Sequence, residues 1–346
     1  MPTNATRSRP LTALLAAVAL GAATYGCGDE GGGGSGSVRV AYSNPVGAQP
    51  GQQDIVFGFE RGAAELGWHA ASIDANLSAD KQVGDIATMV TQHQDGIASW
   101  TLDPGAAAGA YGQARAAGIP VVGVNSAGTG IDATVWWELN LCTTGSPIDD
   151  VAAYIARARP GARVLAIGGP PVPSIQGNER CFARSAAARG LKVVATAHNA
   201  KDAAAPAQAI VADLLTKHPG VDAIWAYNDA TALGASAALT AAGREVYDAG
   251  DADGVLVFGI NGDVDAIAAI RDHRLTGTID PDPVATGWAL IKALSGLVGD
   301  EGAGDPPTRL IVKSATWTSA NIADYRLPRQ RRYTLATVPL ADGATR

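Results

Sequence analysis

The sequence lacks any run of lysine and arginine, and only 17% of its 346 residues are charged. Nucleic-acid-binding surfaces need clustered basic side chains, so the sequence does not indicate that class of function. It also lacks the GxxxxGK[ST], HExxH and GxSxG motifs and a GxGxxG after a strand, and its five histidines are scattered. We therefore expect no enzyme activity, no cofactor and no metal site. A Ser/His/Asp set assembled in space is the alternative.

Cysteine is scarce, with three residues and no CxxC pair, so a zinc site is not indicated. Cys27 follows a short basic region and the apolar stretch Leu11–Ala23, which is too short to span a bilayer and fits a secretory signal. Gly26-Cys27 resembles the lipobox of bacterial lipoproteins, although Thr24 and Tyr25 depart from it. The resemblance implies a signal over residues 1–27, lipidation of Cys27 as a membrane anchor, and a flexible glycine-rich tether over 28–37.

The other two cysteines, Cys142 and Cys181, form an even pair in a chain that the signal predicts to be exported. Exported proteins meet an oxidising environment, which favours a disulfide between them. Two free buried cysteines are the alternative, because spacing alone does not decide between the two states.

From Val38 onward, short β-branched runs alternate with alanine-rich helical windows. Strands are predicted at 38–43, 69–75, 96–102, 119–125, 162–169, 192–198, 221–228, 254–261 and 275–280, with an extended piece at 133–140. Helices are predicted at 53–66, 81–93, 106–117, 148–158, 178–189, 206–217, 229–242 and 264–272. This α/β rhythm runs twice, which predicts two doubly wound lobes built on parallel sheets.

Polar side chains recur where the predicted strands end. They are Asn44, Trp100, Asn125, Asn228, Asn261 and Asp280. Ligands of doubly wound sheets bind at the carboxyl ends of the strands, so these residues are candidate ligand contacts. Each also has an ordinary structural interpretation, since Asn and Asp often cap helices, and we interpret Asp229 as such a cap.

The segments WAYNDATALGASAAL (225–239) and VFGINGDVDAI (257–267) resemble the type I, ribose-binding-like periplasmic sugar-binding proteins of ABC importers. Four further segments match the same family, and all the matching segments occur in the family's order along the chain. They are Asn44-Pro45, DGIASWTLDPGA (95–106), AGIPVVGVN (117–125) and GTIDPDP (277–283). The resemblance covers about residues 38–318 and implies two lobes joined by a three-crossing hinge. The implied first lobe is 38–132 plus 282–307 and the second 133–281 plus 308–322, with a tail at 323–346.

The resemblance also supplies binding residues. Asn228 matches the family's asparagine, whereas Asn125, Asn178 and Asn261 stand where charged residues are usual, and Pro281 replaces a glutamine. Amides donate and accept hydrogen bonds without a charge to desolvate, which favours a neutral ligand. Trp100 is a candidate aromatic platform; for it and for Trp136 and Trp137, core packing is the alternative.

The resemblance implies an exported, monomeric protein that captures a small neutral polar ligand, such as a sugar or polyol, and presents it to an ABC permease. The alternative is a sensor subunit read by a chemoreceptor or sensor kinase. A sugar-responsive repressor would need a helix-turn-helix domain where this chain has a signal and a tether.

Overall fold

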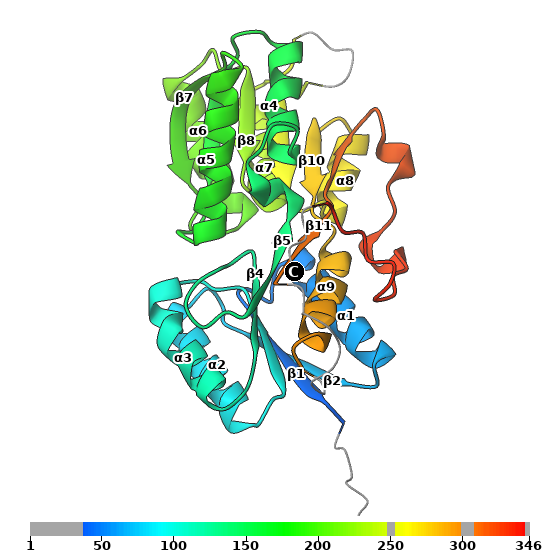
Figure 1. Cartoon of the computed structure of the whole chain (residues 1–346). Coiled ribbons are helices and arrows are strands. Elements are labelled where there is room, and N and C mark those ends of the chain that lie inside the picture. Colours follow the sequence, from blue (N-terminus) through cyan, green and yellow to red (C-terminus); the bar gives the residue numbers. More distant parts are fainter. Residues whose placement is uncertain (1–36, 248–252, 299–307, 343–346) are drawn as a thin grey trace, which may run out of the picture. The chain divides into compact units, whose positions relative to one another are not determined.

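The computed structural model describes residues 37–247, 253–298 and 308–342, which contain two six-stranded α/β lobes (Figure 1). Cys27, the predicted signal and nearly all of the predicted tether lie outside the described residues. Within the described part, none of the helices has the length and apolarity needed to cross a membrane.

The first sheet is entirely parallel, in the order β11-β5-β4-β3-β1-β2. Its strands are β1 (Arg39–Asn44), β2 (His69–Asp74), β3 (Gly96–Ser99), β4 (Val121–Val124), β5 (Ala133–Trp137) and β11 (Arg309–Val312). Helices α1 (Pro50–Glu65) and α9 (Pro283–Ser295) cover one face, and α2 (Ala79–Thr91) and α3 (Pro104–Ala116) cover the other. Strand β1 shows why two faces are covered: Val40 and Tyr42 pack toward α1 and α9, while Ala41 packs toward α2 and α3.

The second sheet has the order β12-β10-β9-β8-β6-β7, and only β12 pairs antiparallel in it. Its strands are β6 (Arg163–Gly168), β7 (Lys192–His198), β8 (Ala223–Ala226), β9 (Leu256–Ile260), β10 (Gly277–Asp280) and β12 (Ala315–Thr318). Helices α4 (Pro147–Ala158) and α5 (Pro173–Ala188) cover one face; α6 (Ala204–Lys217), α7 (Asp229–Ala241) and α8 (Val264–Arg271) cover the other. Tryptophan and phenylalanine fill this core, with Phe182 stacked on Trp225 at 4.8 Å between ring centroids.

The chain passes between the two sheets three times, after β5, after β10 and after β11. The predicted lobe boundaries before residue 133 and before residue 308 are therefore wrong. Both β5 and β11 belong to the first sheet, where they pair in parallel with Val135 opposite Leu310. The sequence predicted an extended piece at 133–140, of which the structure forms β5 over Ala133–Trp137 and a short helix over Glu138–Leu141. A β-branched and aromatic run fits either sheet equally well, so the pattern did not decide which sheet the strand joins.

A disulfide joins Cys142 to Cys181, with their Cα atoms 5.2 Å apart. Cys142 follows the short helix η1 (Glu138–Leu141) at the first crossing, and Cys181 is buried in α5. The bond therefore ties the crossing segment to the second lobe.

After β12 the chain forms two short helical turns, η2 (Ile322–Asp324) and η3 (Pro328–Gln330). It ends its described course with an isolated antiparallel bridge between Leu340 and Val312 of β11. The predicted tail is thus ordered against the body of the protein through residue 342.

Candidate functional site

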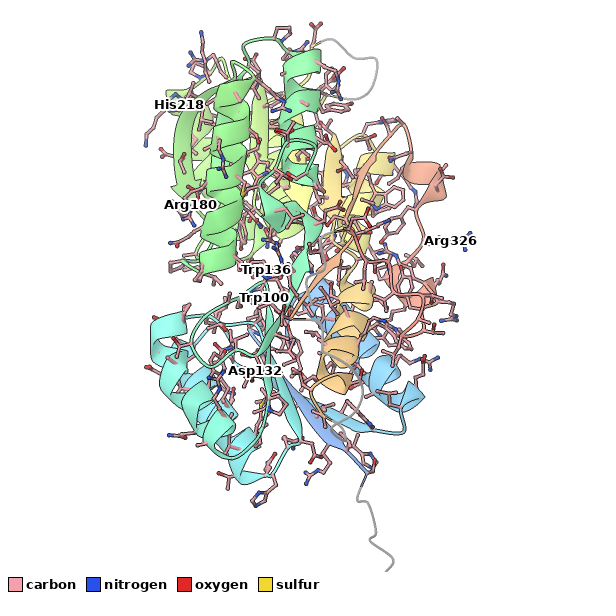
Figure 2. The ribbon with its side chains drawn as sticks, in the orientation of Figure 1. Trp100, Asp132, Trp136, Arg180, His218 and Arg326 are labelled. Carbon is pink, nitrogen blue, oxygen red and sulfur yellow. A yellow bond between two sulfur atoms is a disulfide. The ribbon has the colours of Figure 1, made fainter. Side chains whose placement is uncertain are left out.

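The carboxyl ends of the strands of both sheets meet at a cleft between the lobes. Figure 2 labels Trp100 and Trp136 at this junction. Most of the lining is apolar, and its polar members are mainly amides. The lining residues are Pro45, Val46, Gln49, Gly51, Gln52, Leu77, Trp100, Leu102, Trp137, Asn140, Pro170, Val172, Ser174, Ile175, Asn178, Asp202, Tyr227, Asn228, Ile260, Asn261, Pro281 and Pro283.

Two indole rings form one corner of this cleft. Trp100 and Trp137 pack edge to face, with 4.9 Å between ring centroids and 88° between ring planes. Trp100 Nε1 donates to Ser174 Oγ at 3.2 Å, and Trp137 Nε1 donates to Thr286 Oγ1 at 2.9 Å. Because both indole N–H groups are already bonded, a ligand meets only the carbon surfaces of these rings.

The single charged side chain in the lining, Asp202, is held by three donors. Gln49 Nε2 and Tyr227 Oη donate to its carboxylate, and Asn228 Nδ2 donates at 2.6 Å. Burial raises the pKa of the Asp202 carboxyl, while the hydrogen bonds from these three groups lower it. Gln49 is the N-cap of α1 in the first lobe, so this contact also joins the two lobes.

An asparagine pair lies near the first crossing. Asn140 Nδ2 donates to Asn178 Oδ1 at 2.8 Å, and both residues line the cleft. The buried Asn140 Oδ1 has no hydrogen-bond partner. A buried acceptor without a partner is costly, so this oxygen is a ready site for a ligand donor.

Asn228 and Asn261 reach the cleft from successive strand ends of the second sheet. Asn228 is the N-cap of α7, where its Oδ1 accepts from Thr231 N at 2.9 Å. The prediction of Asp229 as the cap is therefore wrong by one residue, since Asp229 is already inside the helix. Asn261 has a φ of 130° and is followed by Gly262 at 68°. Asn261 lines the cleft from this strained turn, and its side chain also hydrogen-bonds to Asp263.

Three of the seven predicted ligand residues do not line the cleft. Asn44 Oδ1 accepts from Val46 N at 3.0 Å and so shapes the loop after β1. Asn125 Oδ1 accepts from Trp137 N at 2.8 Å and braces β5, and its side chain borders a neighbouring depression. Asp280 points to the opposite side of the β10–α9 crossing, toward Arg331. A strand-end position fixes which edge a residue occupies, but not the direction of its side chain.

The cleft also contains residues that the sequence analysis missed, namely Asp202, Tyr227, Gln49, Asn140 and Ser174. Tyr227 could have been found, because it directly precedes Asn228 at a strand end. Asp202 lies four residues beyond β7 and Gln49 lies in a loop before α1, so periodicity carried no signal for either.

The described residues contain no group of three or more His, Cys, Asp or Glu side chains arranged to hold a metal ion. His198 is half-exposed and contacts Glu179 at 3.0 Å, outside the cleft. Apart from Asp202, the polar groups of the cleft are neutral donors and acceptors set among apolar walls.

Two α/β lobes around such a cleft define a bilobal solute-binding protein. The periplasmic binding protein domain family matches residues 40–302. The chain belongs to this family, in its type I, ribose-binding-like branch.

Individual relatives agree with this assignment. The chain is 30% identical to the ribose import binding protein RbsB of Bacillus subtilis, over 68% of this chain and 73% of the relative. It is 26% identical to RbsB of Escherichia coli, over 64% of this chain and 72% of that protein.

Solved structures share the fold. The myo-inositol binding protein of Caulobacter, bound to myo-inositol, has a TM-score of 0.74 at 23% identity, covering 86% of this chain and 98% of that one. A solute binding protein of Mycobacterium smegmatis with bound glycerol has a TM-score of 0.73 at 22% identity, covering 84% of this chain and 96% of that one.

Proposed function

We propose that this protein captures a small neutral polar ligand, such as a sugar or polyol, in its interlobe cleft and delivers it to an ABC permease. The observation that carries the proposal is the charge balance of the cleft. Its one charged lining residue, Asp202, already accepts from three donors, and the remaining polar groups are neutral. An anionic ligand would find no cationic side chain in this lining, whereas the hydroxyl groups of a neutral ligand match its amides.

The relatives support the same ligand class. The RbsB proteins are named as ribose import binding proteins, and structural neighbours were solved with myo-inositol, D-allose or glycerol. We further propose that the chain is exported, acts as a monomer, and is anchored through a lipid on Cys27. A sensor subunit that presents the closed form to a chemoreceptor or kinase would use the same cleft.

Thermal-shift screening of the purified protein against sugars, polyols, nucleosides and amino acids tests the ligand class. A ligand present at roughly 100 times its Kd adds about 2.7 kcal/mol to the free energy of unfolding. We expect neutral polyhydroxy compounds to raise the melting temperature. A shift caused by anionic compounds alone would contradict the proposal.

Asn228 and Asn261 should contribute directly to binding. We expect Asn261→Leu to weaken the affinity for the best ligand of the screen roughly five- to 150-fold, since the loss of a hydrogen bond to a buried ligand costs about 1–3 kcal/mol. Asn228→Leu should do the same and also remove the cap of α7, lowering stability by about 1 kcal/mol. Isothermal titration calorimetry measures the first effect and urea denaturation the second. Unchanged affinity in both variants would place the binding site elsewhere.

A further inference from the structure

The chain beyond β12 is longer than the third passage between the sheets requires. Residues 325–341, here called the strap, run along α8, α9 and α1 instead of joining either sheet as a strand (Figure 1). The sequence analysis gave this segment no role.

One end of the strap is fixed to the second lobe. Tyr325 Oη donates to Gly262 O at 3.0 Å, in the turn that also holds Asn261. The ring of Tyr325 meets Trp317 of β12 edge to face, with 5.5 Å between centroids. Tyr325 is buried, so this attachment is part of the packed core of the lobe.

The rest of the strap is fixed to the first lobe. Arg329 Nε contacts Asp54 Oδ1 of α1 at 2.8 Å, and Lys292 Nζ of α9 donates to Leu335 O at 2.7 Å. Beyond these contacts, Ala341 N donates to Ile311 O of β11 at 2.8 Å. The strap is therefore a fourth connection between the lobes, in addition to the three passages of the chain.

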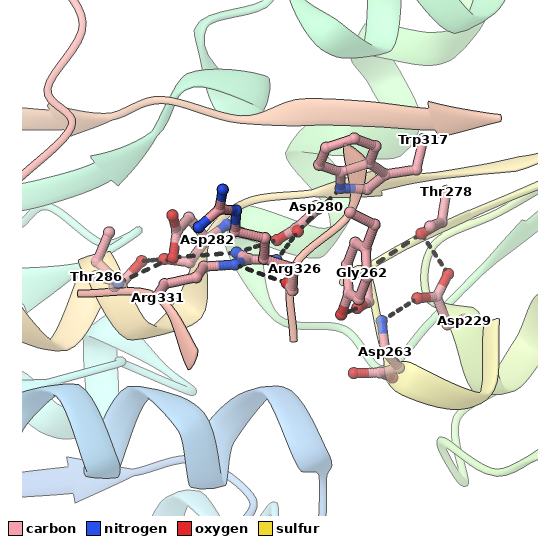
Figure 3. A network of polar contacts seen from close by, with 12 residues as sticks. Asp229, Gly262, Asp263, Thr278, Asp280, Asp282, Thr286, Trp317, Arg326 and Arg331 are labelled. Carbon is pink, nitrogen blue, oxygen red and sulfur yellow. Dashed lines mark hydrogen bonds and ion pairs between the residues drawn. The ribbon is translucent and has the colours of Figure 1, made fainter. Parts of the chain in front are cut away.

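The centre of the strap grips the β10–α9 crossing. Arg331 contacts Asp280 at 2.5 Å and Asp282 at 3.2 Å (Figure 3). Tyr333 Oη also donates to Asp282. The side chain of Arg331 is only 10% exposed and that of Asp280 only 2%. Buried ion pairs of this kind fix geometry, because a carboxylate left without its partner would be strongly disfavoured.

Successive residues of the β10–α9 crossing face two different environments. Asp280 and Asp282 face the strap, whereas Pro281 and Pro283 line the ligand cleft. Asp282 is also the N-cap of α9, with a φ of 53°. Arg331 contacts both aspartates on the side of the crossing away from the cleft. It therefore fixes the positions of Pro281 and Pro283 in the cleft wall and of the first turn of α9.

From these contacts we infer that the strap is a hinge brace, in which Arg331 positions the β10–α9 crossing and favours the closed arrangement of the lobes. Arg331 does not reach the cleft, so its effect on ligand capture passes through Pro281 and Pro283. The inference does not depend on which ligand the cleft takes.

The test compares Arg331→Met with Arg329→Met in the ligand-free, full-length protein. Both variants remove one strap guanidinium, but Arg329 is 57% exposed and contacts only the first lobe. We expect Arg331→Met to increase the radius of gyration in small-angle X-ray scattering. Hydrogen exchange over residues 276–286 should accelerate roughly tenfold, while exchange in β3 stays unchanged. Arg329→Met should match the unmodified protein in both measurements. Equal scattering and equal exchange in Arg331→Met would overturn the inference.

If Arg331→Met does not fold, Tyr333→Phe replaces it, because this variant removes only the hydroxyl that donates to Asp282. Faster exchange at 276–286 with unchanged exchange in β3 would support the brace, and unchanged exchange at both would overturn it. Since no ligand is used, either result leaves the proposed capture function to be decided by the thermal-shift screen.

Discussion

At the scale of single residues, the second lobe contains a buried carboxylate that takes no part in lining the cleft. Asp229 has no exposed surface, accepts from Thr278 Oγ1 at 2.6 Å and Asp263 N at 2.8 Å, and lies beside Asn228 (Figure 3). Burial raises the pKa of Asp229 to about 7, although these hydrogen bonds lower it. Burial and the nearby Asp229 also raise the pKa of Asp263.

This pKa makes a prediction about stability and pH. The folded-state pKa of Asp229 is higher than the unfolded value, so the folded protein binds more protons between about pH 4 and 7. The free energy of unfolding should therefore fall as pH rises through that range, by on the order of 4 kcal/mol, and stay level above it. In urea denaturation at a series of pH values, Asp229→Asn should flatten this dependence. Asp265→Asn, an exposed carboxylate on the neighbouring helix, is the control and should not.

At the scale of elements, the sequence predicted nearly all of the strands and helices. Alternating β-branched runs and alanine-rich windows located β1 to β10 and α1 to α8, mostly within a few residues of their bounds. The assignment of β5 and β11 to a lobe failed, because sheet membership depends on contacts far apart in sequence, such as Val135 with Leu310. The strap could not be predicted, since Arg331 and Asp280 are 51 residues apart and no local pattern links them.

Only part of the candidate site could be predicted from the sequence, because side-chain directions also depend on contacts between residues far apart in the chain. Trp100, Asn178, Asn228 and Asn261 line the cleft, whereas Asn44, Asn125 and Asp280 are used for loop, hinge and strap contacts. Strand ends gather at one edge of a sheet, so their positions are predictable. Which way each side chain turns depends on partners such as Trp137 N or Arg331, which only the tertiary structure supplies.

The disulfide links the segment after η1 to α5, and its removal should measurably change the free energy of unfolding. Cys142 and Cys181 are 39 residues apart in sequence, and closing a loop of that length stabilises the folded state by about 4 kcal/mol in the chain-entropy view. We expect the double variant Cys142→Ser/Cys181→Ser to lower the free energy of unfolding by roughly 2–4 kcal/mol. Denaturation of the unmodified protein with and without reductant is the matched comparison, and equal stability in both would mean that the thiols are free.

At the scale of the whole described molecule, the closed cleft is held by contacts that pass directly from lobe to lobe. Gln49 of the first lobe donates to Asp202 of the second, and Trp100 donates to Ser174 in the same way. Each contact stabilises the closed arrangement and is lost when the lobes separate. A ligand's apparent affinity scales with the fraction of protein in the binding-competent state, so the loss of either contact should lower that affinity.

Gln49→Ala tests this coupling. The variant removes one donor from a buried carboxylate, and we expect ligand affinity to fall roughly tenfold with little change in melting temperature of the free protein. Gln53→Ala, in the first turn of α1, is the matched control, because Gln53 Nε2 donates to Gly47 O within the first lobe. A loss of affinity in the control as large as in Gln49→Ala would mean that the helix, and not the interlobe contact, is responsible.

The paired indoles at the corner of the cleft also give the protein an optical property. Trp100 and Trp137 lie close enough, at 4.9 Å between ring centroids, for their electronic transitions to couple. Trp100 is bonded to Ser174 across the cleft, so separation of the lobes changes the surroundings of one ring of the pair. Near-ultraviolet circular dichroism and intrinsic fluorescence should therefore follow opening and closing in the unlabelled protein.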